Sequence, residues 1–179
     1  MDLTANPSHR LLHSFCIRPD VRFDIQEKDE EVILVLRAHP ITLLPWIING
    51  IILFILLIFL NIVFGSLLSP AQFFLLNLTI TIFILSYLWF NFLAYFFNVG
   101  IVTNKRVIDI DFSTVIYREV TEAGLKQIED ITSKSGGYFA SLFDYGDVFI
   151  QTAGTDVNIE FLKIPKPAEV VSIVNSFIS

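Results

Sequence analysis

The dominant pattern in the chain is a long apolar run without charge. Residues 38–104 contain no Asp, Glu, Lys or Arg. A helix needs about 20 apolar residues to cross a hydrocarbon core about 30 Å thick, so this run is long enough for two crossings. A Gly-Ser-Leu-Leu-Ser-Pro segment that starts at Gly65 favours a turn near its middle. We therefore predict a two-helix transmembrane hairpin over residues 41–96, with spans at about 43–64 and 71–92.

Basic residues near the spans predict the orientation of the hairpin. Arg37, Lys105 and Arg106 flank the hairpin, whereas the connecting turn has no basic residue. Because Lys and Arg are enriched in cytoplasmic loops, we expect a multi-pass protein of the cell membrane with both termini in the cytoplasm. Aromatic residues near span ends often sit at the membrane interface. The candidate anchors of this kind are Trp46, Trp89 and Tyr95.

Uncharged polar residues occur within the spans. A transport path normally requires ionisable groups inside the membrane, and the spans contain none. Asparagine side chains can instead hydrogen-bond between neighbouring helices. We interpret the polar residues as packing contacts, with a conduction path as the alternative. The asparagines concerned are Asn49, Asn61, Asn77 and Asn91.

After the hairpin, apolar and polar residues alternate with a period of two. Ile108, Ile110 and Phe112 share one face of a predicted strand, while Asp109 and Asp111 share the other. This alternation is typical of strands with one buried face. The spacing favours an antiparallel meander. Further strands are expected at 97–103, 115–121, 125–133, 148–152 and 157–161.

The two ends of the chain complete the expected organisation. Residues 1–36 form a polar segment, and the apolar run 31–37 is either a strand or an early start of the first span. At the other end, apolar residues recur on one helical face over 167–178, which predicts an amphipathic helix. Strands closed by such a helix give an α+β domain at 97–179.

Short motifs in a fixed order carry a resemblance to a known family. They are Thr103-Asn-Lys-Arg-Val-Ile108, Ile128-Glu-Asp-Ile131, Phe143-Asp-Tyr-Gly-Asp-Val148 and Ile164-Pro-Lys-Pro167, after an Arg37-Ala-His-Pro40 lead into the first span. In this order they resemble the membrane-flanked bacterial pleckstrin-homology (PH-like) family. The resemblance implies an antiparallel β barrel or sandwich closed by a C-terminal helix. It implies no shared ligand and no catalytic residue.

Residues suited to catalysis or metal binding are few and scattered. His9, His13 and His39 precede or open the first span, and Cys16 is the only cysteine. Nucleophilic and metal chemistry need such groups clustered on a rigid frame. We therefore expect no enzyme, no catalytic or metal site and no cofactor. We expect His39 to face the membrane interface or to cap the first span.

The charge balance argues against anionic partners. The chain has a net charge of −6 and no polybasic stretch, so we expect no nucleic acid partner. The part after the hairpin has 7 basic and 11 acidic residues. Lys105 and Arg106 would lie about 20 Å beyond Phe97 at about 3.3 Å per residue, farther than a Debye length of about 8 Å. We interpret them as turn residues.

An aromatic segment is the best candidate for a binding surface. Up-and-down strands would return it toward the membrane, where it would contact either a partner or the membrane interface. Its residues are Tyr138, Phe139, Leu142, Phe143 and Tyr145. The alternative is ordinary packing within the barrel.

We therefore expect a non-catalytic interaction or scaffolding module that is anchored in the lipid bilayer on its cytoplasmic face. Its partner would be another protein or further copies of the same chain. Two other functions stay open. One is a subunit of a larger membrane transport or secretion complex, and the other is a module that binds lipid headgroups.

Overall fold

The computed structural model describes residues 13–19, 23, 26–114, 117–153 and 158–178. The chain divides into two compact units. One unit consists of residues 43–94, and the other combines residues 1–42 with residues 95–179. The helical unit is thus inserted into the sequence of the other unit, which we call the β domain.

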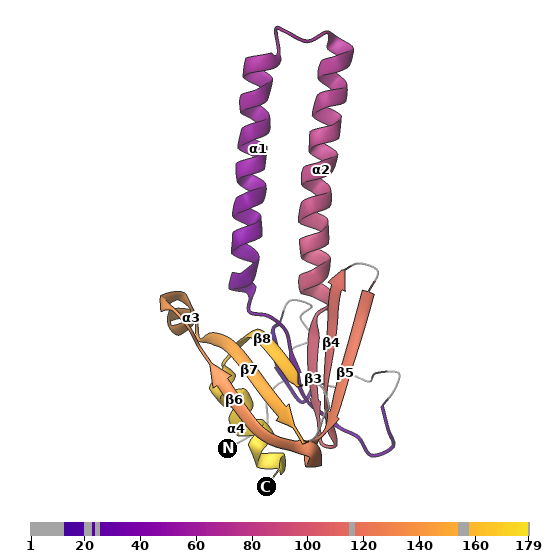
Figure 1. Cartoon of the computed structure of the whole chain (residues 1–179), viewed down its shortest axis with the longest axis vertical. Coiled ribbons are helices and arrows are strands. Elements are labelled where there is room, and N and C mark those ends of the chain that lie inside the picture. Colours follow the sequence, from indigo (N-terminus) through magenta and orange to yellow (C-terminus); the bar gives the residue numbers. More distant parts are fainter. Residues whose placement is uncertain (1–12, 20–22, 24–25, 115–116, 154–157, 179) are drawn as a thin grey trace. The chain divides into compact units, whose positions relative to one another are not determined.

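Two long helices make up the helical unit (Figure 1). A 3-10 helix, Pro40–Leu43, leads into α1, Leu44–Phe64, and α2 follows as Pro70–Phe97. Pro70 suits the first position of α2 because that position needs no backbone N–H donor. Both helices are long and apolar enough to cross a membrane. Only 11% of the most apolar stretch of the first and 6% of that of the second is buried.

Small and polar residues join α1 to α2. A Cβ at Gly50 would lie 2.7 Å from the Leu88 side chain, so the two helices approach closely there. The Asn61 and Asn77 side-chain amides donate to one another's oxygen at 2.8 Å in both directions. Close approach at glycine and hydrogen bonds across helices are typical of helix pairs in membranes. Asn61 and Asn77 therefore make the predicted packing contact.

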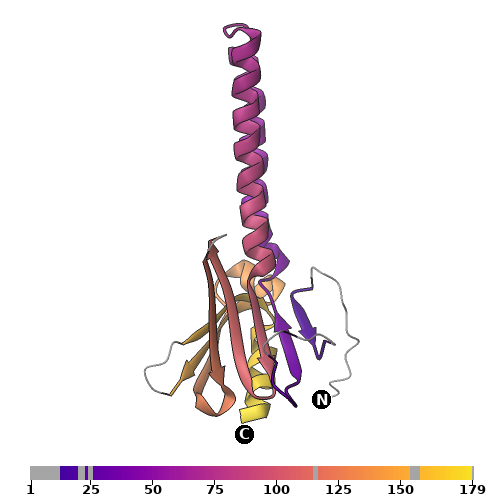
Figure 2. The same cartoon turned by 90° about the vertical axis from the view of Figure 1, so that its right-hand side faces the viewer.

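Antiparallel strands form two sheets in the β domain, and Figure 2 shows the longer strands side by side. The first sheet has the order β1-β2-β3-β4-β5, and the second has the order β6-β7-β8. The first comprises β1 Phe15–Ile17, β2 Val32–Leu36, β3 Val99–Thr103, β4 Arg106–Thr114 and β5 Tyr117–Gly124. The second comprises β6 Ile128–Lys134, β7 Tyr145–Thr152 and β8 Ile159–Pro165.

Strands from both sides of the helical insertion pair with each other. β2 precedes α1 and β3 follows α2, yet Leu36 pairs with Gly100 and Val32 pairs with Thr103. The chain therefore leaves and re-enters the first sheet at the same end. The predicted domain at 97–179 omits β1 and β2. For β2 the reason is that a short apolar run beside a longer one does not show whether it belongs to the sheet or to the span.

The core of the β domain lies between the two sheets and α4, Pro167–Ile178. α4 packs on β6 and β7 through its apolar face and covers the range predicted for it. Burial of apolar side chains here is the main stabilising term of the domain. The fully buried core residues include Leu34, Leu36, Val102, Val107, Val148, Ile150, Val170 and Val174.

The alternation in β4 suggests that the face with Ile108 and Ile110 is the inner one, but the structure differs. Val107 is fully buried in the core, whereas Asp109 lies on the same face two residues later. Asp109 pairs with Gly100, and a Cβ at Gly100 would meet the ring of Phe161 in β8. The face with the aspartates therefore turns toward the second sheet. Because Ile108 on the opposite face is buried too, alternation alone does not identify the inner face.

The close approach of Gly100 to Phe161 gives a test of this packing. A Cβ at position 100 would clash with Phe161 Cε1, and an aromatic ring that is almost fully buried has little room to move. We expect Gly100→Ala to lower the free energy of unfolding by about 1–3 kcal/mol, the usual cost of overpacking. Urea unfolding of the full chain in detergent measures this. The matched control is Gly136→Ala, whose Cβ would meet nothing within 4 Å.

Phe161→Leu in the Gly100→Ala background should recover part of the lost stability, because it removes the atoms that clash. Equal stability of the Gly100→Ala and Gly136→Ala variants would contradict the packing of β3 against β8.

Candidate functional site

A short helix carries most of the predicted aromatic surface. α3 spans Tyr138–Phe143 and connects β6 to β7. Gly137 precedes it with a φ of +91°, a conformation that glycine adopts easily, and Asp144 ends it in the left-handed region. The Ser141 N–H donates to the Gly137 carbonyl at 3.2 Å. These two turns direct the chain out of the sheet and back into it.

The side chains of α3 point mostly into solvent. Tyr138 is 96% exposed, Phe139 69% and Leu142 75%. Phe143 is also exposed, whereas Ala140 is buried. Ordinary barrel packing, the alternative for this segment, therefore does not account for these four large side chains. Exposed apolar groups gathered at one place often mark a contact surface, so the prediction of a partner or membrane-interface contact stands.

The base of α3 is fixed to neighbouring elements. Tyr145, the half-buried fifth residue of the predicted group, pairs with Pro165, and the Asp144 carbonyl accepts the Lys166 N–H at 2.8 Å. The His39 ring stacks on Tyr145 with 5.6 Å between centroids and lies 6.4 Å from Phe143. α3 is therefore attached at its C-terminal end to β8 and to the segment that leads into α1.

His39 holds the start of the helical insertion to the β domain. Its backbone N–H donates to the Lys163 carbonyl at 2.7 Å. Its Nδ1 accepts the Ile41 N–H at 3.1 Å, and its carbonyl accepts the Thr42 hydroxyl at 2.7 Å. His39 thus makes local hydrogen bonds at the start of the 3-10 helix, and its expected role at the membrane interface or as a cap of the first span stays a prediction. Burial lowers the pKa of the His39 imidazole, and nearby Asp144 opposes that shift. The neutral ring is thus the favoured form at neutral pH.

The three predicted membrane anchors differ in their surroundings. Trp46 is half-buried and Trp89 is exposed, with the Trp89 ring 6.2 Å from that of Phe92. Tyr95 is buried, and its hydroxyl lies 3.2 Å from the Ser14 hydroxyl. Tyr95 therefore packs within the β domain, and its role as an interfacial anchor stays a prediction, as it does for Trp46 and Trp89. A residue near the end of an apolar run can belong to either unit, and the sequence pattern does not distinguish them.

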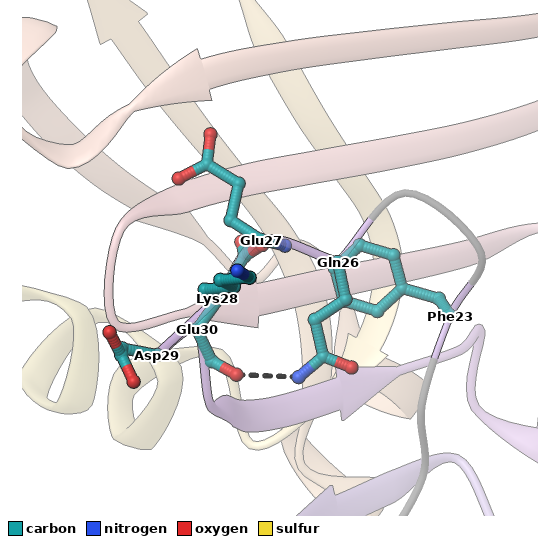
Figure 3. A pocket seen from close by; sticks show the side chains of 6 residues that line it. All are labelled: Phe23, Gln26, Glu27, Lys28, Asp29 and Glu30. Atoms are coloured by element: carbon teal, nitrogen blue, oxygen red, sulfur yellow. Dashed lines mark hydrogen bonds between the residues drawn. The ribbon is translucent and has the colours of Figure 1, made fainter.

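A polar pocket lies in the loop before β2 (Figure 3). Its volume is about 470 Å³. The Gln26 side-chain amide donates to the Glu30 carbonyl across it. Most of the lining comes from consecutive residues of one loop, so the pocket is a feature of how that loop folds. The lining residues are Phe23, Gln26, Glu27, Lys28, Asp29 and Glu30.

A buried ion pair fixes this loop to the turn between β3 and β4. The Glu30 side chain is fully buried, and Arg106 donates to both its oxygens, from Nε at 3.1 Å and from Nη2 at 3.2 Å. The Thr103 hydroxyl and the Glu27 N–H also donate to the carboxylate, both at 2.8 Å. Burial raises the pKa of Glu30, but hydrogen bonds, led by that from Arg106, lower it overall.

Arg106 and its neighbour Lys105 are both occupied by partners within the domain. Lys105 Nζ lies 3.1 Å from a Glu27 carboxylate oxygen, and Arg106 also pairs with Glu122 at 2.9 Å. The hydrogen bond and charge of Glu30 raise the pKa of Arg106. Lys105 lies in the turn as predicted, whereas Arg106 is the first residue of β4. Sequence reasoning missed the Glu30–Arg106 pair, because Glu30 stands in a charged cluster that resembles a solvated loop.

Carboxylates gather on the inner face of β4. Burial and, after it, the charges of Asp111, Glu119 and Glu160 together raise the pKa of Asp109 to about 7, and a backbone hydrogen bond from Ile110 partly opposes this rise. Burial and Glu119 also raise the pKa of Asp111. Within the described part of the chain, no three His, Cys, Asp or Glu side chains are grouped closely enough to hold a metal ion.

Comparison with known proteins identifies the family. Residues 32–177 match the family described as Bacterial PH domain. The chain belongs to that family. This confirms the resemblance seen in the sequence motifs, and with it the PH-like antiparallel sheets closed by a C-terminal helix. The protein is thus a bacterial PH domain protein with two long apolar helices inserted between β2 and β3.

A solved structure is similar to part of the chain. It is the 2.00 Å crystal structure of a DUF1696 family protein with a pleckstrin-homology domain from Shewanella loihica PV-4. The match has 22% identity and a TM-score of 0.33, and it covers 45% of this chain and 67% of that one. No curated protein shows a significant similarity to the chain.

The Glu30–Arg106 pair of this bacterial PH domain gives a prediction about stability. Arg106→Met would leave the Glu30 carboxylate buried and unpaired, so we expect a loss of about 3–5 kcal/mol in the free energy of unfolding. Lys105→Met removes the neighbouring exposed ion pair and should cost less than about 1 kcal/mol. Urea unfolding of the full chain in detergent provides both values.

Neutralising both partners distinguishes the ion pair from simple loss of contacts. The double variant Glu30→Gln with Arg106→Met leaves no buried charge and should be more stable than Arg106→Met alone. A double variant that loses the sum of the two single effects would show that the pair is not coupled.

The half-buried Asp109 predicts a pH dependence. Its pKa is raised on folding, so the protonated side chain stabilises the fold below a pH of about 4, and this contribution is lost as the pH rises through about 7. We expect Asp109→Asn, which stays neutral, to raise the melting temperature clearly at pH 8 and little at pH 5. Asp130→Asn at an exposed position of β6 is the control. A gain that is the same at both pH values would argue against this ionisation.

Proposed function

We propose that the protein is a non-catalytic, membrane-anchored interaction or scaffolding module whose PH-like domain lies on the cytoplasmic face of the cell membrane. The observation that carries this proposal is the pairing of β2 with β3 around the helical insertion. One domain holds both ends of a pair of apolar helices, as expected of a domain tethered by a membrane hairpin.

The surface of the helices supports a membrane environment. Large apolar side chains along both α1 and α2 are exposed, among them Ile55, Phe59, Phe83 and Leu85. Apolar surface in water costs about 25 cal/mol per Å², so two long helices of this kind need an apolar solvent or cover. A lipid bilayer supplies it, and each helix is long enough for one crossing.

The same strand pairing supports a topology in which both termini share one side. Leu36 and Gly100 are partners in one sheet, so the chain before α1 and the chain after α2 cannot lie on opposite faces of a bilayer. The basic residues Arg37, Lys105 and Arg106 then favour the cytoplasm as that side.

An interaction role is favoured over the other two candidate functions. Lys105 and Arg106, two of the basic residues that flank the hairpin in the sequence, are held by acidic partners of the domain itself, which weakens the case for headgroup binding. The Asn61–Asn77 amides satisfy each other between the helices, which weakens the case for a conduction path.

Lysine crosslinking in membranes tests this function. All six lysines of the chain lie outside the apolar run, so an amine crosslinker that does not cross membranes reaches them only from the side of the β domain. With the full chain in native membranes, we expect a defined adduct with a protein partner or with a second copy. It should form in inside-out vesicles and not in intact cells.

The outcomes of this experiment separate the parts of the proposal. Adducts that form in intact cells would overturn the cytoplasmic placement. A chain that stays monomeric at its natural abundance, with no adduct from either side, would overturn the interaction role. The control is to dissolve the vesicles in detergent before crosslinking. A protein that is close only by chance then separates on dilution and gives no adduct, whereas a stably bound partner still does.

A further inference from the structure

The surface of α3 is unusual for a region that faces water. From Ser135 to Phe143 the chain has no charged residue, and the three most exposed side chains are Tyr138, Leu142 and Phe139. Only Ala140 of this helix is buried. Such a segment gains little from contact with water, and its aromatic side chains provide apolar area together with one hydroxyl.

The position of α3 within the β domain restricts which partner can contact its exposed aromatic side chains. Its base contacts His39, and His39 precedes the start of α1 at Leu44 by five residues. Five residues span at most about 17 Å, so the base of α3 lies at the end of the domain from which the chain leaves for α1.

The opposite end of the β domain is made of other turns. The Lys105 carbonyl accepts the Leu125 N–H there, which joins the β3–β4 turn to the segment between β5 and β6. Val99 begins β3 beside the exit, and Thr103 ends it next to this far end. The aromatic surface of α3 and the ionic turn of Lys105 thus mark opposite ends of the same domain.

We propose that α3 inserts its aromatic face into the boundary between headgroups and acyl chains of the bilayer that α1 and α2 cross, as a second attachment of the domain. This inference rests on the proposed membrane crossing. It commits to lipid because α3 lies at the end of the domain that leads into the hairpin, and because a short uncharged helix with Tyr and Phe suits this boundary.

The charges around α3 indicate that the attachment does not depend on anionic lipid. The Lys134 ammonium lies over the Phe149 ring at 4.7 Å, and Lys166 pairs with Glu169 at 3.0 Å. Lys134 and Lys166 thus have partners in the domain. The attachment is therefore driven by apolar area and differs from recognition of a particular headgroup.

Depth-dependent quenching tests the proposal on the full chain. In a Cys16→Ser background, which removes the only cysteine, a fluorescent maleimide is placed at Leu142→Cys on α3. The matched control is Lys126→Cys, an exposed site beside the far turn. Ile55→Cys in the middle of α1 reports the membrane crossing itself. Each protein is reconstituted into phosphatidylcholine vesicles that contain lipid with a quencher at the headgroup, near the glycerol or deep in the acyl chain.

We expect the Leu142 probe to be quenched several-fold more than the Lys126 probe, most strongly by the shallow acyl quencher, and the Ile55 probe most strongly by the deep one. Phosphatidylglycerol in the vesicles should not change this order. Quenching at Leu142 equal to that at Lys126, with Ile55 still quenched, would overturn the inference and leave the proposed anchoring intact. An unquenched Ile55 probe would overturn the anchoring as well.

A protein contact at α3 gives a different result. A Leu142 probe that is shielded from water but not quenched by lipid, with a signal that grows with the protein-to-lipid ratio, would assign α3 to a second copy and overturn the inference. Tyr138→Ser with Phe139→Ser provides a second measurement, because the loss of both rings should reduce quenching at Leu142 several-fold.

Discussion

The pairing of β2 with β3 is the constraint on which the rest of the structure depends. It joins two strands that are separated by the whole helical insertion, and Leu36 meets Gly100 across it. Closing a loop of this length costs entropy that grows only slowly with its length. The two helices reduce the problem further, because an antiparallel pair returns the chain close to the point where it left. The pairing of β2 with β3 therefore depends on two helices that bring the chain back to the end of the sheet where it left.

Two further contacts hold the re-entry point in place. Gly100 lets β3 approach Phe161 of the second sheet, so the strand that follows α2 is also part of the central core. At the far end of β3, the Glu30–Arg106 pair joins the loop before β2 to the β3–β4 turn. The segments before and after the insertion are thus connected by the backbone hydrogen bonds between β2 and β3, by packing in the core and by the buried Glu30–Arg106 ion pair. A buried ion pair adds little net stability, but a conformation that leaves one of its two charges buried without the other is strongly disfavoured.

Long apolar or amphipathic stretches of sequence predicted their helices well, whereas short stretches did not predict their strand or helix. The first span at about 43–64 became α1, but α2 continues to Phe97 because the apolar pattern does not stop at 92. The amphipathic 167–178 run became α4. β2 was ambiguous because five apolar residues fit both a strand and the start of a span. α3 was not predicted as a helix because six residues are too few for a helical period to show.

Predictions about the candidate site depended on which residues meet in space, and this is where the sequence was least informative. The aromatic residues of α3 were identified from composition, yet their exposure follows from Gly137 and Asp144, whose backbone turns carry the segment away from the sheet. Tyr95, predicted as a membrane-interface anchor, is buried, with its hydroxyl 3.2 Å from that of Ser14, a contact that its place at the end of an apolar run did not indicate. One end of the domain therefore presents exposed aromatic rings, whereas Lys105 and Arg106 at the other end are paired internally. A partner at that ionic end would have to recognise shape and hydrogen bonds more than net charge.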